Sequence, residues 1–243
     1  MEAAQRLRPQ RLDVLIELAA TLGRHVAVDV DPDSDLMTAE FVEDFSARLI
    51  AYHAFHEQKL TKKTFEFVFR GACRAAGRRA EITSSPVNPG ADVTVDGVPF
   101  SLKTEGACSM SRDRITISKL MEARWIRECR TPEDFARETV TRVVDRLRSY
   151  RRILVLRAFS SGAQFEYHLV EIPLGVLMQV QHLTAADFSD RTNNGGSNAH
   201  VEIDGKIAFT LRLDGSVEKV TVSGLRLHFC RPHATWRVER LLR

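Results

Sequence analysis

The 243-residue sequence lacks several features that would assign its class at once. No apolar run approaches the ~20 residues that a membrane-spanning helix requires. The first eight residues contain no apolar stretch typical of a secretion signal. The four cysteines, at positions 73, 108, 129 and 230, form no close pair, which argues against a disulfide framework. We therefore expect no membrane partner, and a protein of the reducing cytoplasm.

The sequence also lacks a strong charge of either sign. Lysine and arginine total 35 against 32 acidic residues, so the net charge of +3 does not by itself predict a nucleic-acid partner. Hydrophobic residues make up 44% of the chain, which is enough for a substantial core. The length supports one continuous domain, and no internal repeat is apparent.

The most informative segment is a predicted β-hairpin near the middle of the chain. Residues 92–95 alternate in polarity and lead into Asp96-Gly97, a strong type I′ turn signal. On the returning strand, residues 98–104, alternation places Ser101, Lys103 and Glu105 on one face. A carboxylate at Asp92 can therefore lie near Lys103 across the turn. Such a pair suits phosphodiester chemistry, in which a carboxylate holds a divalent cation and a lysine stabilises charge or orients water.

Further elements surround this hairpin. Apolar spacing predicts a helix over 62–77, closed by Gly77, and a short strand over 80–83. After the hairpin we expect a helix capped by Ser118 that carries Glu122, and a second helix from Thr131 to about Tyr150. Strands over 153–159 and 165–172 follow, and the first is a continuous apolar run typical of a buried strand.

At these residues the sequence resembles the PD-(D/E)xK nuclease superfamily, and within it the type II restriction endonucleases. Pro89-Gly90-Ala91-Asp92 matches the first element with two extra residues between proline and aspartate. Ser101-Leu102-Lys103 matches the second element, with serine in the position of the acid. The resemblance covers roughly residues 60–160. It implies an α/β fold with a mixed central sheet flanked by helices.

The resemblance also implies roles for individual side chains. Asp92 would ligate Mg²⁺ and Lys103 would contact the scissile phosphate or the attacking water. Because Ser101 cannot supply an anion, a second carboxylate must come from elsewhere, and Glu122 is favoured over Glu105. Glu66, on the preceding helix, is a further candidate, although a solvated first-turn glutamate is an equally good interpretation.

The regions on either side of this core have different characters. Residues 1–60 are predicted to be helical, over 12–22 and 36–56, with the acidic segment 29–35 as a linker. Residues 61–185 form the predicted catalytic core. Residues 186–243 combine a polar loop over 190–200, expected to be mobile, with a β-meander over 201–230.

Some side chains are candidates for DNA binding, since arginine pairs with phosphates and guanine edges, and amides pair with adenine. Arg112 and Arg114 are favoured, because they lie just downstream of the predicted site. For each of the others alone, a solvated surface is at least as good an interpretation. The candidates are Arg112, Arg114, Asn193, Asn194, Asn198, Lys206, Arg212 and Arg231.

The sequence therefore predicts a Mg²⁺-dependent, sequence-specific endodeoxyribonuclease that acts on double-stranded DNA as a homodimer, in a bacterial or archaeal cell. Two alternatives stay open. One is a monomeric nicking or repair nuclease of the same fold. The other is a DNA-binding protein that has lost catalysis, because Ser101 stands where an acid is expected.

Overall fold

The computed structural model describes residues 8–83 and 91–239. Pro89 and Gly90, which belong to the predicted first motif, lie outside these residues. The described helices and strands are α1 (Pro9–Leu22), β1 (Ala27–Val30), α2 (Ala39–Phe55), α3 (Lys62–Ala75), β2 (Ala80–Ile82), β3 (Val93–Val95), β4 (Val98–Glu105), β5 (Arg114–Glu122), α4 (Pro132–Glu138), α5 (Val144–Arg148), β6 (Arg152–Ser161), β7 (Gln164–Ile172), α6 (Leu174–Leu177), β8 (Ser197–Ile203), β9 (Lys206–Asp214), β10 (Lys219–Arg226) and β11 (Arg231–Glu239). Within this part of the chain, no helix is long and apolar enough to cross a membrane.

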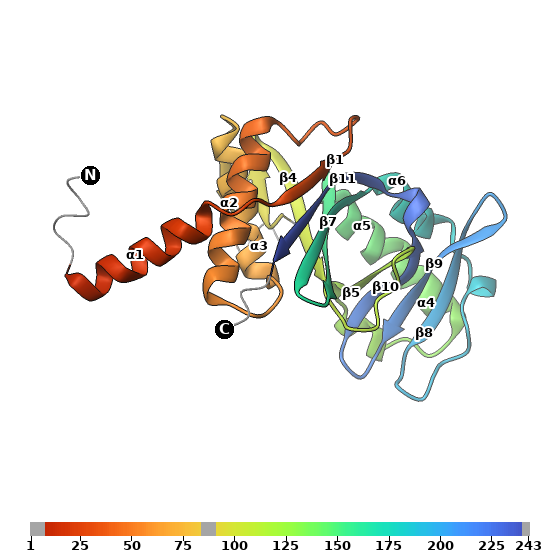
Figure 1. Cartoon of the computed structure of the whole chain (residues 1–243). Coiled ribbons are helices and arrows are strands. Elements are labelled where there is room, and N and C mark those ends of the chain that lie inside the picture. The colour runs from red at the N-terminus through yellow and green to blue at the C-terminus, as the bar shows by residue number, and fades with distance from the viewer. Residues whose placement is uncertain (1–7, 84–90, 240–243) are drawn as a thin grey trace.

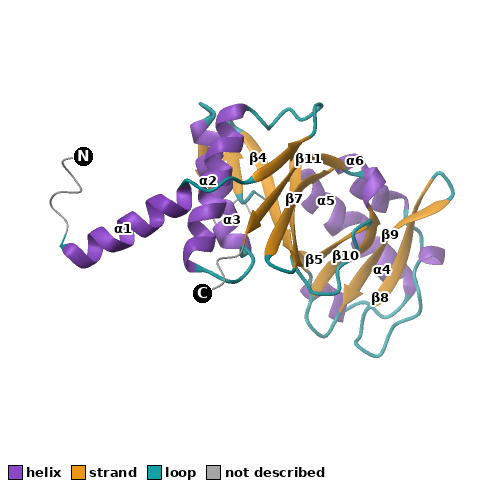
Figure 2. Ribbon diagram, in the orientation of Figure 1, coloured by secondary structure: helices purple, strands orange, loops and turns teal. Residues whose placement is uncertain are grey.

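The fold has a mixed central sheet of seven strands, in the order β1-β11-β7-β6-β4-β3-β2 (Figures 1 and 2). Strands β4 and β6 pair in parallel, and the other pairs in this sheet are antiparallel. Helices α2 and α3 cover one face. The other face packs against α4, α5 and a second sheet of four strands, in the order β5-β10-β9-β8. The predicted mixed α/β architecture is confirmed.

The elements around the hairpin form for the reasons that the sequence indicates. Helix α3 buries Phe65, Phe69 and Cys73 at helical spacing, and the Thr61 side chain caps it by accepting a hydrogen bond from the Thr64 backbone. The turn between β3 and β4 has positive φ at Asp96 (50°) and Gly97 (82°), as a type I′ turn requires. Strand β6 is buried almost throughout, because both of its faces are covered.

The predicted helix over 131–150 is confirmed with one irregularity. Thr131 and Asp134 form a capping box at its start. A π-helical stretch over Thr139–Val143 separates α4 from α5, so the helical segment is not a uniform α-helix.

Several element predictions are wrong. Residues 118–126 do not form a helix: 114–122 form strand β5, which pairs with β10, and a short 3₁₀ turn follows. Ile115 and Ile117 are buried at the two-residue spacing of a strand. The apolar residues of 120–126 have the spacing of a helix, which led to the wrong prediction. The acidic segment was read only as a linker, but residues 27–30 form the edge strand β1 against β11.

The polar loop is also shorter than predicted. Strand β8 begins at Ser197, so Asn198 and His200 lie in a strand rather than in a mobile loop. The remaining loop is tightly packed: a Cβ atom at Gly196 would lie 1.7 Å from the Leu213 carbonyl oxygen. Thr192 and Gly196 are joined by a 2.8 Å backbone hydrogen bond. Gly196, which has no Cβ atom, allows this close approach to β9.

The C-terminal strands divide between the two sheets. Strands β8, β9 and β10 form the predicted meander, and β11 returns to the central sheet between β1 and β7. The division of the chain at residues 60 and 185 remains a prediction.

A buried ion pair connects the two sheets. The Arg157 side chain on β6 is fully buried, and its Nε atom donates to Glu105 Oε2 on β4 at 2.7 Å. The other oxygen of Glu105 accepts from the Thr116 backbone on β5 at 2.9 Å. Arg157 also donates to the carbonyl oxygens of Ser111, Arg112 and Arg114. This pair fixes the start of the second sheet against the first.

Removal of either partner of this pair should destabilise the fold strongly. We expect Glu105→Gln or Arg157→Met to lower the free energy of unfolding by about 3–5 kcal/mol, because each leaves an uncompensated buried charge. The double variant should lose less than the sum of the two single variants. Equilibrium urea denaturation measures both effects.

The exposed pair Arg237–Asp29, at 2.7 Å, provides the control. Arg237→Met should cost less than ~1 kcal/mol. If Arg157→Met lowered the free energy of unfolding by no more than Arg237→Met does, the structural role of the buried pair would be contradicted.

Candidate active site

Asp92 lies just before β3, and strand β4 holds its carboxylate in place. Oxygen Oδ2 accepts hydrogen bonds from the Leu102 backbone at 2.7 Å and from the Ser101 hydroxyl at 3.3 Å. Ser101 is fully buried. Ser101, which stands in the predicted position of the acid, therefore donates a hydrogen bond to Asp92 and helps to orient its carboxylate.

Lys103 follows on the same strand. Burial is the main influence on its ammonium group and lowers its pKa from 10.5 to about 8. The charge of Asp92 acts in the opposite direction, while Lys62 and Arg146 add to the depression. A lysine with a depressed pKa beside a carboxylate is typical of a functional site.

Glu66, on the second turn of α3, joins the same cluster. Lys62 Nζ lies 2.6 Å from Asp92 Oδ1 and 3.3 Å from Glu66 Oε1, so one ammonium group contacts both carboxylates. Burial raises the pKa of Glu66, although the nearby Lys62 opposes this shift. The structure thus brings Asp92, Ser101, Lys103 and Glu66 together.

Asp92 and Lys103 of this cluster line a cleft of about 720 Å³ between α3, β4, β5 and α5. The segment 117–122 of β5 forms the opposite wall. Arg146 lies in the wall as well, with its Nε donating to the Tyr150 hydroxyl at 2.8 Å. Four cations, including Lys119, line the cleft beside its carboxylates, a composition suited to a phosphate group.

The structure places the other predicted acids differently. Glu105 is engaged with Arg157 and the Thr116 backbone, so it does not face the cleft carboxylates. Glu122 does line the cleft, but from the end of β5 instead of from a helix. Its side chain is 70% exposed, and a hydrogen bond from Lys119 lowers its pKa. The relative importance of Glu122 and Glu105 stays a prediction.

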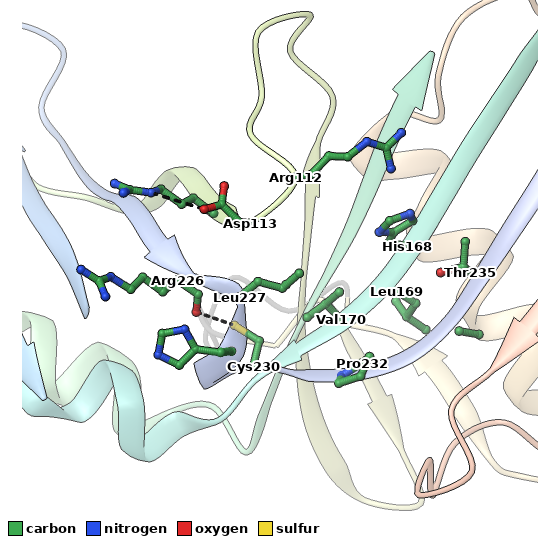
Figure 3. Close-up of a pocket in the computed structure, with 13 residues that line it drawn as sticks. Arg112, Asp113, His168, Leu169, Val170, Arg226, Leu227, Cys230, Pro232 and Thr235 are labelled. Atoms are coloured by element: carbon green, nitrogen blue, oxygen red, sulfur yellow. Dashed lines mark hydrogen bonds and ion pairs between the residues drawn. The ribbon is translucent and has the colours of Figure 1, made fainter. Parts of the chain in front are cut away.

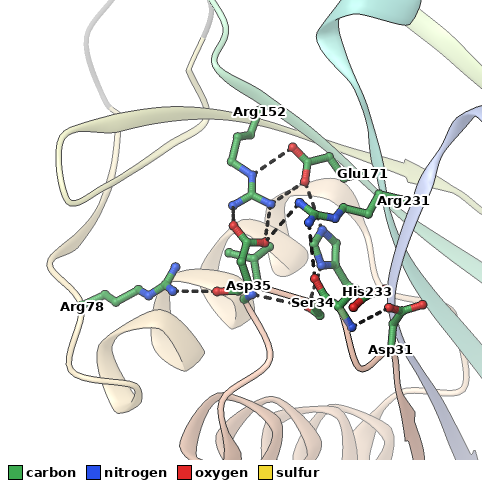
Figure 4. Close-up of polar contacts among 10 residues, drawn as sticks. Asp31, Ser34, Asp35, Arg78, Arg152, Glu171, Arg231 and His233 are labelled. Atoms are coloured by element: carbon green, nitrogen blue, oxygen red, sulfur yellow. Dashed lines mark hydrogen bonds and ion pairs between the residues drawn. The ribbon is translucent and has the colours of Figure 1, made fainter.

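A second acidic cluster lies where the β1–α2 connection meets β6, β7 and β11 (Figure 4). Potential ligand atoms of Asp35, Glu171 and His233 lie within 4.8 Å of one another. However, Arg152 donates to both carboxylates, and Arg231 lies 3.8 Å from Asp35. Arginine keeps its charge in proteins, so it already neutralises these acids. The cluster therefore acts as an ion-pair network that joins the β1–α2 connection to β6, β7 and β11.

A separate pocket of about 840 Å³ lies beside β7 and β11 (Figure 3). Its lining is largely apolar, and Arg112 and Arg226 extend outward at its sides (Figure 3). Arg114 also lines the pocket. Its one carboxylate, Asp113, is exposed and forms an ion pair with Arg114. With no second acid among its lining residues, this pocket does not offer the chemistry of the cleft.

The predicted DNA-binding residues separate into distinct regions. Arg112 forms a 2.9 Å ion pair with Glu166 and stacks on Phe159, and Arg114 is exposed beside it. Arg231 belongs to the network around Asp35, and Lys206 lies at the β8–β9 turn. The remaining candidates line a polar groove of about 1160 Å³ on the second sheet, and they are Asn193, Asn194, Asn198 and Arg212.

Sequence reasoning missed two residues of the cleft, Lys62 and Arg146. Lys62 lies four residues before Glu66, which places both on one helix face, and this spacing was the available signal. Arg146 is one of several arginines in residues 137–152, for which the sequence favours an ordinary solvated helix face. Arg137, Arg142 and Arg148 do pair with acids of their own helix, whereas Arg146 turns toward the cleft.

Together, the mixed sheet and the cleft in which an aspartate, a glutamate and a buried lysine converge define a nuclease of the PD-(D/E)xK class. Comparison with known proteins gives the family. Residues 2–238 match the family model described as SmaI, type II site-specific deoxyribonuclease. The type II restriction enzyme SmaI of Serratia marcescens is 32% identical over 209 residues, which cover 83% of this chain and 81% of that enzyme.

The chain belongs to the SmaI family of type II site-specific deoxyribonucleases. It is therefore an enzyme that cleaves DNA at specific sequences. A solved restriction endonuclease in complex with substrate DNA aligns with 74% of each chain, at a TM-score of 0.38 and 12% identity. This remote likeness adds nothing to the assignment.

The buried lysine should cost the protein stability. Its pKa of about 8 lies below the unfolded value near 10.5, so the unfolded chain binds more protons between these pH values. The free energy of unfolding of the wild type should therefore rise with pH across this window. Lys103→Met should be more stable than the wild type below pH 8, by at most about 3 kcal/mol.

This advantage should shrink toward zero as the pH approaches 10.5. Urea denaturation of both proteins across this range measures the difference, which cancels the titration of other groups. Lys119→Met, at an exposed position on the same cleft, is the control and should show no such trend. A Lys103→Met advantage that does not depend on pH would contradict the depressed pKa.

Proposed function

We propose that the chain hydrolyses double-stranded DNA in the cleft around Asp92, with a divalent cation, Mg²⁺, held by Asp92 and Glu66. The observation that carries this proposal is the Lys62 ammonium group between the two carboxylates. A cation is already favoured at this position. Protein sites for Mg²⁺ often use one or two carboxylates and complete the coordination with water and substrate phosphate.

The side chains of the cleft have separate roles in this proposal. Ser101 and the Leu102 backbone orient Asp92. Lys103 lies on the same strand and contacts the scissile phosphate or the attacking water. Lys62 and Arg146 attract the phosphate backbone. The cation, when bound, supplies Lewis-acid stabilisation and lowers the pKa of the attacking water.

This assignment favours Glu66 as the second acid. Glu66 shares Lys62 with Asp92, whereas Glu122 is exposed and Glu105 is occupied by Arg157. Glu122 lines the same cleft and is retained as a third acid that could approach the bound phosphate from β5. Membership of the family favours an active enzyme over a DNA-binding protein without catalysis.

Substitution of the cleft residues should abolish cleavage and leave DNA binding largely intact. We expect Asp92→Asn, Glu66→Gln and Lys103→Ala each to reduce the single-turnover rate by roughly 10²–10³-fold or more, since each removes charge stabilisation from the transition state. Binding depends mainly on phosphate contacts elsewhere and should change little at constant salt. Cleavage of phage DNA with Mg²⁺ and fluorescence anisotropy measure the two properties.

Glu81→Gln, on the exposed side of β2, is the matched control. Mn²⁺ titration calorimetry should also show weaker binding for Asp92→Asn and Glu66→Gln than for the control. A fully active Glu66→Gln together with an inactive Glu122→Gln would transfer the second ligand to Glu122.

We also propose that the enzyme acts as a homodimer. Each chain has one acid–lysine cleft among its described residues, and the two antiparallel strands of a duplex require two such clefts related by a two-fold axis. Helix α1 extends away from the rest of the molecule and exposes large apolar side chains (Figure 1). Ile16 is 58% exposed and Val14 51%.

Helix α1 suits a second copy of itself. A free helix of this length is only marginally stable in water, so it requires a partner surface. Arg11 and Glu17 lie at equal distances from Val14 along the helix. In an antiparallel pair centred on Val14, each Arg11 would face Glu17 of the partner subunit.

A charge on this helix should therefore separate the subunits. We expect the wild type to sediment as a dimer and Val14→Glu to sediment mainly as a monomer at micromolar concentration, because this change puts a charge at the centre of the pair. Analytical ultracentrifugation measures the two masses. Val217→Glu, at a similarly exposed apolar position (58%) on the β9–β10 turn, should stay dimeric. A dimeric Val14→Glu would place the interface elsewhere.

A further inference from the structure

The outer face of the second sheet is polar across all of its strands. Strands β8, β9 and β10 turn alternate apolar residues inward, including Val201, Leu211 and Val222, which are at most 2% exposed. The residues between them point to the other face of the sheet and line the groove of about 1160 Å³. They include Asn198, His200, Thr210, Arg212, Thr221 and, on β5, Thr116. The groove is thus a direct consequence of the two-residue period of the strands.

The strand register arranges these side chains in a row. Asn198 on β8 is directly opposite Arg212 on β9, and Arg212 is directly opposite Thr221 on β10. Thr221 donates a 3.0 Å hydrogen bond to the Ser118 carbonyl on β5. The row therefore crosses the sheet from its free edge at β8 to β5.

Strand β5 is shared between the groove and the cleft. Ser118 lines both of them, so the row of polar side chains ends at the wall of the cleft that contains Asp92 and Lys103. A duplex with one phosphate in the cleft would pass directly over this row.

The central side chains of the row have unused hydrogen-bonding capacity. Among the described residues, no hydrogen bond or ion pair joins the side chain of Asn198 or Arg212 to another group. Arg137, Arg142 and Arg148 differ, since each of them pairs with a neighbouring acid. An exposed guanidinium group opposite an amide on the neighbouring strand offers hydrogen-bond donors at positions that the strand register sets.

We propose that this outer face reads the edges of base pairs in the bound DNA, with Arg212 and Asn198 as the residues that determine specificity. Arg212 recognises a guanine, because its paired N–H donors match the O6 and N7 acceptors of that base in the major groove. Asn198 contacts the neighbouring base of the same row. The major groove of B-DNA admits a β-structure of this kind. This inference rests on the proposed cleavage reaction at Asp92.

The test begins with the sequence preference of the wild type. Digestion of a phage genome with Mg²⁺, followed by sequencing of the ends, gives the cleaved site. A duplex with that site and a scrambled duplex then serve as probes. For Arg212→Ala we expect about 5–150-fold weaker binding of the site, corresponding to the 1–3 kcal/mol of one bidentate base contact.

For the same variant, binding of the scrambled duplex should change by less than three-fold relative to wild type. If Arg212 only attracted phosphates, both duplexes would lose affinity equally, because phosphate contacts do not depend on sequence. Asn198→Ala should relax the preference at an adjacent base pair. Lys206→Ala is the control, because it lies on β9 at the turn outside the groove. It should retain the wild-type ratio of specific to scrambled binding.

The outcomes separate this inference from the proposed function. If the wild type cuts at a defined site and Arg212→Ala keeps the same site and affinity ratio, the groove does not read bases. Equal losses on both duplexes would also overturn base reading. If Asp92→Asn and the wild type cleave at equal rates, the proposed active site fails, and the binding ratio of Arg212→Ala still tests the groove.

Discussion

The buried ion pair between Arg157 and Glu105 is the constraint on which the arrangement of the two sheets depends. It joins β4 and β6 of the central sheet to the beginning of β5 and to three carbonyl groups of the preceding segment. Strand β5 forms one wall of the cleft and one edge of the polar groove. The shapes of the cleft and the groove therefore both depend on where the ion pair holds β5. A buried pair whose remaining hydrogen-bonding groups are satisfied fixes geometry better than an apolar contact of similar size, because its bonds are directional.

In the cleft, too, directional hydrogen bonds and ion pairs fix the position of a carboxylate. Asp92 is oriented by the backbone and by a buried hydroxyl group, while Lys62 neutralises it together with Glu66. Lys103 is kept in an environment that disfavours its charge. Such a site is destabilising for the protein without substrate, and binding of a phosphate would relieve the cost. In the role that we propose for Lys103, activity and stability are therefore opposed.

The two acidic clusters of the molecule show why a count of carboxylates does not identify a metal site. Asp35 and Glu171 are as close to a histidine as a metal site requires, yet two arginines already compensate their charge. Asp92 and Glu66 share a lysine on a flexible stem, which another cation can displace more easily. The identity of the neighbouring cation, rather than the number of acids, distinguishes the carboxylates of this ion-pair network from those that we propose as metal ligands.

The sequence by itself determined the local elements whose signals are carried by adjacent residues. The Asp96-Gly97 turn, the α3 stripe and the apolar run of β6 each specify one conformation, and the alternation of β4 put Ser101 and Lys103 on one face. From these elements the mixed α/β class and the Asp92–Lys103 pairing could be predicted. The family resemblance pointed to the same nuclease class.

Only the tertiary structure decided which other side chains join the pair. Glu105 shares a strand face with Lys103, but the buried Arg157 captures it from another strand. Residues 118–126 have helical spacing, but pairing with β10 makes 114–122 a strand and places Glu122 at its exposed end. Lys62 and Glu66 reach Asp92 because α3 packs against the hairpin, and Asn198 meets Arg212 through strand register. Contacts of this kind depend on pairing between distant segments, which local periodicity does not encode.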